Sequence, residues 1–110
     1  MTVDALKSFG ANVDEGLRRC MNNEGFYLKM VAKAVQNDCF EKLEGAIKEN
    51  NLDAAFDAAH ALKGVLANLA LSPIRDPICE IVELLRSKTQ MDYSPLVQKI
   101  LEKRNELKAL

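Results

Sequence analysis

The chain contains one histidine, and the residues around it are the ones whose types and spacing could do chemistry. Lys63 follows His60 by three residues and Gly64 follows it by four. On a helix, side chains at these spacings lie on one face, one turn apart. A neutral imidazole has one nitrogen with a free lone pair, so an exposed His60 could act as a nucleophile and carry a phosphoryl group. Lys63 could then pair with the negative charge of that group.

Gly64 calls for an explanation because it lies in the interior of an expected helix. A glycine in that position costs about 1 kcal/mol relative to alanine. Having no side chain, it leaves room beside His60 for the backbone of another protein or for a bulky group on the ring. Lys63 is expected to tune a phosphorylated state, not to create it, because an exposed ion pair contributes only about 0.2–1 kcal/mol.

The helix that carries these residues is expected to span residues 52–70. At about 100° per residue, His60 lies roughly 140° from the centre of the apolar arc and therefore points towards solvent. Phe56, Asp57 and Ala67 share the outer face with it. The positions in the apolar arc, which we expect to face the core, are Leu52, Ala55, Ala58, Ala59, Leu62, Val65, Leu66 and Leu69.

The rest of the sequence shows helical periodicity and no convincing period of two, which predicts an all-α fold. Asn12 and Glu15 have the spacing of a capping box, and Ser72 followed by Pro73 is a second start signal. Pro77 raises the alternative that the regular helix starts only there. The expected helices are 3–9, 12 to about 22, 24 to about 49 with a break possible near Asn37 and Asp38, 52–70, 72 to about 88, and 92–95 to the end.

Four helices of this length, joined by short loops, pack side by side in alternating directions. We therefore expect an antiparallel up-and-down four-helix bundle, with the short N-terminal helices capping one end. At 110 residues the chain is long enough for one core and too short for two. The prediction is a single domain over residues 1–110.

Composition narrows the range of partners. With 15 basic and 16 acidic residues, the chain has no basic footprint for nucleic acid. It has no apolar run near the roughly 20 residues that cross a bilayer and no export signal, so we expect a cytoplasmic monomer without membrane contact. Cys20, Cys39 and Cys79 fit neither a disulfide framework nor a zinc site and are expected to be reduced thiols in or near the core. No nucleotide-binding motif is present, and no cofactor or metal is expected.

The stretch His60-Ala61-Leu62-Lys63-Gly64 resembles the signature of histidine-containing phosphotransfer (HPt) domains. Residues 16–21 and 27–43 also resemble the helices that precede this motif in the family. The resemblance implies a four-helix-bundle carrier in a multistep phosphorelay. His60 would take a phosphoryl group on Nε2 from the aspartyl phosphate of a response-regulator receiver domain and pass it to another receiver. Lys63 would be the charge partner of the phosphate, and Gly64 the gap that admits the receiver.

The same resemblance implies the partners and the docking surface. Receiver domains are the expected partners, with a hybrid sensor kinase as a further one. The metal ion and the acidic pocket belong to the receiver, so the chain would need neither ATP nor a metal of its own. Phe56 and Ala67, together with Leu17 and Met21 from the second helix, are the expected docking residues.

Two positions depart from the family pattern. Leu66 stands where the family usually has serine or alanine, and Ala70 stands where it usually has glycine. Leu66 lies in the apolar arc, so we expect it to change the core and leave the face of His60 intact. We expect Ala70 to affect only the turn after the helix.

Two other functions remain as alternatives. The departures at Leu66 and Ala70 motivate a helical adaptor that binds receivers or kinases without carrying phosphate. His60 with Asp57 could instead serve a hydrolytic or acid/base enzyme. Such an enzyme would need a concave pocket around His60, and a protruding helix face is convex.

Overall fold

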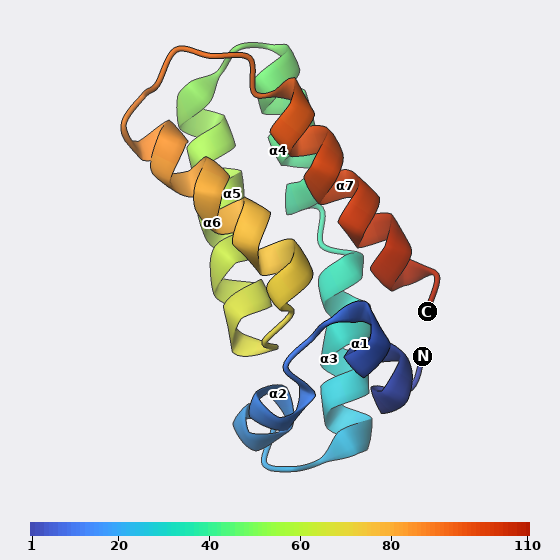
Figure 1. Ribbon diagram of the computed structural model, residues 1–110. Helices are drawn as coiled ribbons and strands as arrows, with labels where there is room; N and C mark the ends of the chain where they lie inside the picture. Colours follow the sequence, from blue (N-terminus) through green and yellow to red (C-terminus); the bar gives the residue numbers. More distant parts are fainter.

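Seven α-helices and no strand make up the computed structural model, which describes residues 1–110 (Figure 1). The prediction of an all-α fold is therefore confirmed. The helices are α1 (Val3–Phe9), α2 (Val13–Arg19), α3 (Glu24–Val35), α4 (Cys39–Lys48), α5 (Leu52–Asn68), α6 (Ser72–Arg86) and α7 (Ser94–Lys108).

Helices α4 to α7 form the body of the bundle and run alternately up and down (Figure 1). Each packs against the next, and α7 also packs against α4, so the four helices close into a ring. Helix α3 extends the line of α4 and contacts α7 as well. The expected antiparallel four-helix bundle is present, with α3 and α4 together as its first arm.

The first arm is interrupted near Asn37 and Asp38, where the sequence allowed a break. Instead of one helix from Glu24 to Glu49, α3 ends at Val35 and α4 begins at Cys39. The side chain of Asn37 accepts a hydrogen bond from the backbone N–H of Cys39 at 2.8 Å. Asparagine competes for backbone hydrogen bonds in this way and favours helix ends over helix interiors. The possible break near Asn37 and Asp38 is confirmed.

Several helix bounds differ from prediction, and α5, expected over residues 52–70, ends at Asn68. The second helix was expected to reach Asn22, but α2 ends at Arg19, and Met21 and Asn22 have φ of 57° and 56°, in the left-handed region. A start of the sixth helix at Pro77 is wrong, because α6 begins at Ser72 and Pro77 lies inside it. A proline removes one backbone donor, and packing of the apolar face outweighs that loss. Ser72 itself is the first helical residue and not the cap, which is Leu71.

All seven helices contribute to a core of 27 buried residues. The short N-terminal helices join this core through Leu6 and Val13, and they cap the end of the bundle where α5 turns into α6 (Figure 1). At that end the hydroxyl of Tyr27 donates a hydrogen bond of 3.0 Å to the carbonyl of Leu69. The three cysteines are free thiols; Cys20 is buried and the other two are half-buried, as expected.

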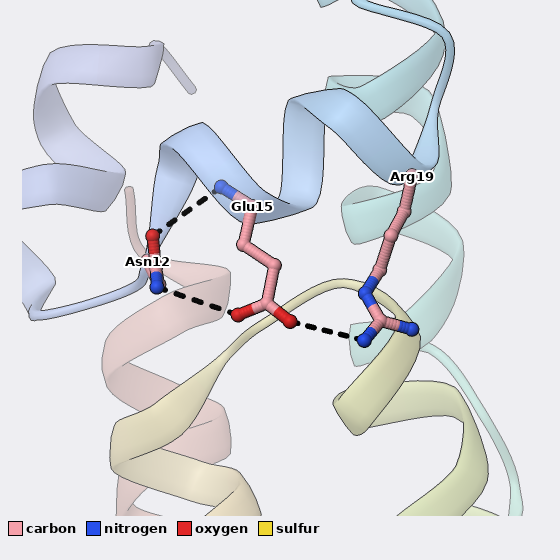
Figure 2. A network of polar contacts seen from close by, with 3 residues as sticks. All are labelled: Asn12, Glu15 and Arg19. Carbon is pink, nitrogen blue, oxygen red and sulfur yellow. Dashed lines mark hydrogen bonds and ion pairs between the residues drawn. The ribbon is translucent and has the colours of Figure 1, made fainter.

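Asn12 caps α2 as predicted, but only half of the expected capping box forms, because the Glu15 carboxylate bonds the side chain of Asn12 and not its backbone N–H (Figure 2). The side chain of Asn12 accepts a hydrogen bond from the backbone N–H of Glu15 and donates one to the Glu15 carboxylate, both at 3.3 Å. The other oxygen of this carboxylate accepts a hydrogen bond from Arg19 at 3.0 Å. The backbone N–H of Asn12 donates to the carbonyl of Ala70 at 3.0 Å. The cap thus orients α2 and ties it to the turn that follows α5.

Candidate functional site

Helix α5 presents the site, and local interactions fix both of its ends. At the start, the side chain of Asn51 accepts a hydrogen bond from the N–H of Ala54 at 3.1 Å, which satisfies a donor that the first turn leaves open. At the end, Ala70 adopts a left-handed conformation with φ of 54°. The N–H of Leu71 donates to the carbonyl of Leu66 at 3.1 Å, which is the main bond of a Schellman motif. His60 therefore lies in the middle of a helix with two well-defined ends.

The two faces of α5 have the predicted characters. The inner face is buried, with Leu62 fully enclosed and Leu66 1% exposed. His60 is exposed, so the expectation that it points to solvent is confirmed. Because Leu66 is buried in the core, its departure from the family pattern does not touch the surface around His60. Ala70 likewise is buried in the turn and away from that surface.

Lys63 and Gly64 lie one turn beyond His60, towards the C-terminal end of α5. Lys63 is half-buried and pairs with no carboxylate, so its ammonium group is free to meet an incoming anion. A Cβ atom added at Gly64 would find no atom within 4 Å outside its own helix turn. The space beside His60 is therefore open, and packing of the fold does not explain this glycine.

An aromatic ring supports the histidine from the other side. The rings of Phe56 and His60 stack with centroids 5.5 Å apart and an angle of 27° between their planes. The guanidinium carbon of Arg86 lies over the Phe56 ring, 5.5 Å from its centroid. Arg86 belongs to the last turn of α6, so two helices contribute to this arrangement.

Arg86 is the residue of the site that the sequence reasoning missed. A signal was available, since Phe56 lies 15 residues before Leu71 and Arg86 lies 15 residues after it. In two antiparallel helices joined at a tight turn, residues equally far from the turn lie at the same level. Using that signal requires the exact position of the turn, which the expected helix ends did not give.

The remaining expected docking residues occupy different places. Ala67 is half-buried, two turns beyond His60 on α5. Leu17 packs against the core from α2, whereas Met21 follows α2 in the turn and is 83% exposed. Helix α2 lies against the end of α5, since a Cβ atom at Gly16 would meet the carbonyl oxygen of Leu69. That end is about 12 Å along the helix from His60. The docking role of all four residues stays a prediction.

None of the five principal surface depressions is lined by His60. The nearest along the sequence is a shallow groove between α4 and α5 that includes Gly45 and Asp57. No group of three histidine, cysteine, aspartate or glutamate side chains is placed to hold a metal ion. No helix is both long and apolar enough to cross a membrane.

The helical bundle displays one histidine from the middle of a helix, with open space beside it, as the resemblance to phosphotransfer domains implies. Comparison with family models agrees, since residues 32–110 match the Hpt domain. The match covers well over half of the chain, and the chain belongs to the Hpt domain family. It has no match among the curated proteins or among the solved structures.

Membership in the family defines a general role. Hpt domains take part in histidine phosphotransfer within phosphorelays, where they act as phosphocarriers and not as kinases. They interact with receiver domains and kinases. The chain therefore belongs to a family that serves phosphorelays by histidine phosphotransfer.

Proposed function

We propose that the chain is a phosphocarrier in which His60 accepts a phosphoryl group from the aspartyl phosphate of one receiver domain and passes it to another. The observation that carries the proposal is the placement of the only histidine of the chain. It is exposed in the middle of α5, next to a glycine with open space around it. The proposal treats residues 1–110 as one unit, because α1 and α2 share the core of the bundle.

The transfer step needs no group from this chain beyond the imidazole. The lone pair of the unprotonated ring nitrogen attacks the phosphorus atom of the acyl phosphate. A nitrogen–phosphorus bond forms, and the bond from phosphorus to the bridging oxygen breaks, so that the receiver regains a free aspartate carboxylate. The proton on the other ring nitrogen stays there, and the phosphorylated ring carries the positive charge. The reverse sequence on a second receiver completes the relay.

Lys63 and Gly64 have distinct parts in this proposal. The unpaired ammonium group of Lys63 stabilises the phosphoryl group on His60 through charge, to the modest extent that solvent screening allows. Gly64 lets the surface of a receiver approach the ring, because no side chain stands in the way. The receiver supplies the metal ion and the acidic pocket, so the carrier itself needs no cofactor.

The partners in this proposal are receiver domains, either free or joined to a hybrid sensor kinase, and we place the carrier with them in the cytoplasm as a monomer. No structural observation favours an adaptor that carries no phosphate, because the two departures that motivated it lie in the core and in a turn. The adaptor remains an outcome of the test. An enzyme built on His60 and Asp57 lacks a depression around the histidine that could enclose a substrate.

The test is transfer from a phosphorylated receiver. The purified chain is mixed with receivers carrying radiolabelled phosphate, and the label on the chain is followed through acid and alkali. A phosphohistidine is labile in acid and stable in alkali, and an acyl phosphate is not stable in alkali. We expect an alkali-stable label on the wild type and none on His60→Gln. Equal labelling of both proteins would refute the proposal, and stable binding without any label would favour the adaptor.

A further inference from the structure

The contact between Phe56 and His60 suggests a role for Phe56 other than the predicted docking of a receiver. The imidazole of His60 takes part in no hydrogen bond or ion pair with another group of the protein. A histidine that reacts is usually oriented by a hydrogen bond to its second nitrogen. Here the stacked ring of Phe56 is the contact that can orient it.

The stack follows from helix geometry. Every Cα–Cβ bond of a helix tilts towards the N-terminus, so a side chain lies over the residue four positions earlier. His60 accordingly rests on Phe56, with ring centroids 5.5 Å apart. A leucine or alanine at position 56 would offer contact, but no flat face to set the plane of the imidazole.

Helix α6 holds Phe56 in turn. The guanidinium of Arg86 lies over the Phe56 ring at 5.5 Å, and Glu83 pairs with Arg86 at 3.5 Å on the surface of α6. Phe56 is only half-exposed and also packs against the core. A ring that is held by its own helix and by a neighbouring helix can act as a fixed support for the histidine.

A stack is compatible with the chemistry of His60. The lone pair of an imidazole nitrogen lies in the plane of the ring, so the nitrogen attacks along its edge. Phe56 occupies a face of the ring and leaves both nitrogen edges free. The contact can therefore limit rotation of the ring without blocking the approach of a phosphorus atom.

We propose that Phe56 is a positioning residue for phosphoryl transfer, which fixes the plane of the His60 ring through a stack that Arg86 holds in place from α6. This inference rests on the proposed function, because it concerns the same histidine. It assigns Phe56 to the rate of the chemical step, whereas a docking residue would change the strength of receiver binding.

The experiment compares Phe56→Leu, Phe56→Tyr and the wild type in single-turnover transfer at increasing receiver concentration. A stacked aromatic pair contributes about 0.5–1.5 kcal/mol beyond the area it buries. Losing that energy corresponds to a factor of about two to ten in rate. We expect Phe56→Leu to lower the maximal transfer rate by that factor and to leave the half-saturating receiver concentration within about twofold. Phe56→Tyr keeps the ring and should retain the wild-type rate. Phe26→Leu, at the half-exposed phenylalanine of α3, is the matched control and should leave the maximal rate unchanged.

A second readout does not depend on any receiver. Because the chain has one histidine, its ring protons give a single set of NMR signals. We expect Phe56→Leu to move these signals towards the values of a free histidine, as the ring-current effect of Phe56 is lost, and Phe26→Leu to leave them in place. The thermal unfolding of the variants shows whether the fold is intact.

The outcomes separate the inference from the proposed function. A rise in half-saturating concentration with an unchanged maximal rate would assign Phe56 to docking and overturn the positioning role. Unmoved histidine signals in Phe56→Leu would show that the stack does not hold the ring and would overturn it as well. Failure of the wild type to accept any label would refute the proposed function, while the NMR comparison would still decide whether Phe56 orients His60.

Discussion

At the scale of single residues, Lys63 is the charged side chain expected to meet a phosphoryl group on His60. Lys63 has no carboxylate partner to lose when an anion arrives. Because an exposed pair contributes about 0.2–1 kcal/mol, Lys63→Ala should slow transfer by a factor of about two to five and not abolish it. Quenched time courses of phosphoryl transfer at low and high salt measure the transfer rate. The effect of the substitution on that rate should shrink at high salt. An unchanged rate at low salt would contradict the role of Lys63.

Gly64 gives a sharper prediction at the same scale. Glutamine is a better helix former than glycine, and the space at position 64 is open, so Gly64→Gln should preserve or slightly raise the free energy of unfolding. The longer side chain should nevertheless obstruct a docking receiver and reduce transfer strongly. Gly25→Gln on α3, where an added Cβ would make only an ordinary contact of 3.6 Å with the side-chain oxygen of Asn23, is the matched control. Transfer by Gly64→Gln at the wild-type rate would show that the open space is not used.

At the scale of helices, packing of α2 against α3 and α5 depends on another glycine. A Cβ atom at Gly16 would lie 2.5 Å from a ring carbon of Tyr27 and 2.8 Å from the carbonyl oxygen of Leu69. We expect Gly16→Ala to lower the free energy of unfolding by about 1–3 kcal/mol, the usual cost of overpacking. Denaturant unfolding measures the loss. The control is Gly45→Ala, at an open position inside α4, which should raise stability by about 1 kcal/mol. Equal effects of the two substitutions would contradict the packing described at this end.

Helix starts were predictable because the signals for them are local. Asn12 and Asn51 each cap a helix through a hydrogen bond to a backbone N–H three residues later, and the spacing of Asn12 and Glu15 indicated the first of these caps. Helix ends and interruptions were less predictable. The end of α2 at Arg19 and the passage of α6 through Pro77 depend on how the helices pack, which no local pattern contains.

In the candidate site, too, some features could be predicted from the sequence and others could not. The exposure of His60 and the open space at Gly64 followed from helix periodicity, because both depend on the angular position of a residue on one helix. The contact of Arg86 with Phe56 joins α5 and α6, and it requires the register between them. That register is set by the turn at Ala70, whose left-handed conformation the sequence did not indicate.

At the scale of the whole molecule, one ion pair ties α4 to α7 and makes stability depend on pH. Arg104 donates a hydrogen bond of 2.9 Å to Glu41 and also lies over the ring of Phe40. The hydrogen bond from Arg104 lowers the pKa of Glu41 below its ordinary value. A carboxyl group with a lowered pKa stabilises the folded state above the unfolded pKa of about 4.3. That contribution is lost as the pH falls through the folded value.

The expected contribution is small, because the Glu41 side chain is 60% exposed and solvent screens the pair. Replacing Arg104 with glutamine should lower the free energy of unfolding at pH 7 by more than at an acidic pH below the lowered folded pKa of Glu41, where the carboxyl group is protonated in both states. Urea unfolding of the wild type and the variant at the two pH values measures the difference. A loss of equal size at both would attribute the effect to packing on Phe40 alone.

The claim on which the account depends is that phosphate is carried on the ring of His60. The most direct measurement is a proton–phosphorus correlation NMR spectrum of the intact chain, recorded after transfer from a phosphorylated receiver and held at alkaline pH. The account predicts one phosphorus signal coupled to ring protons of the single histidine, which disappears in His60→Gln. A phosphorus signal without that coupling, or no signal on the chain while the receiver loses its phosphate to water, would contradict it.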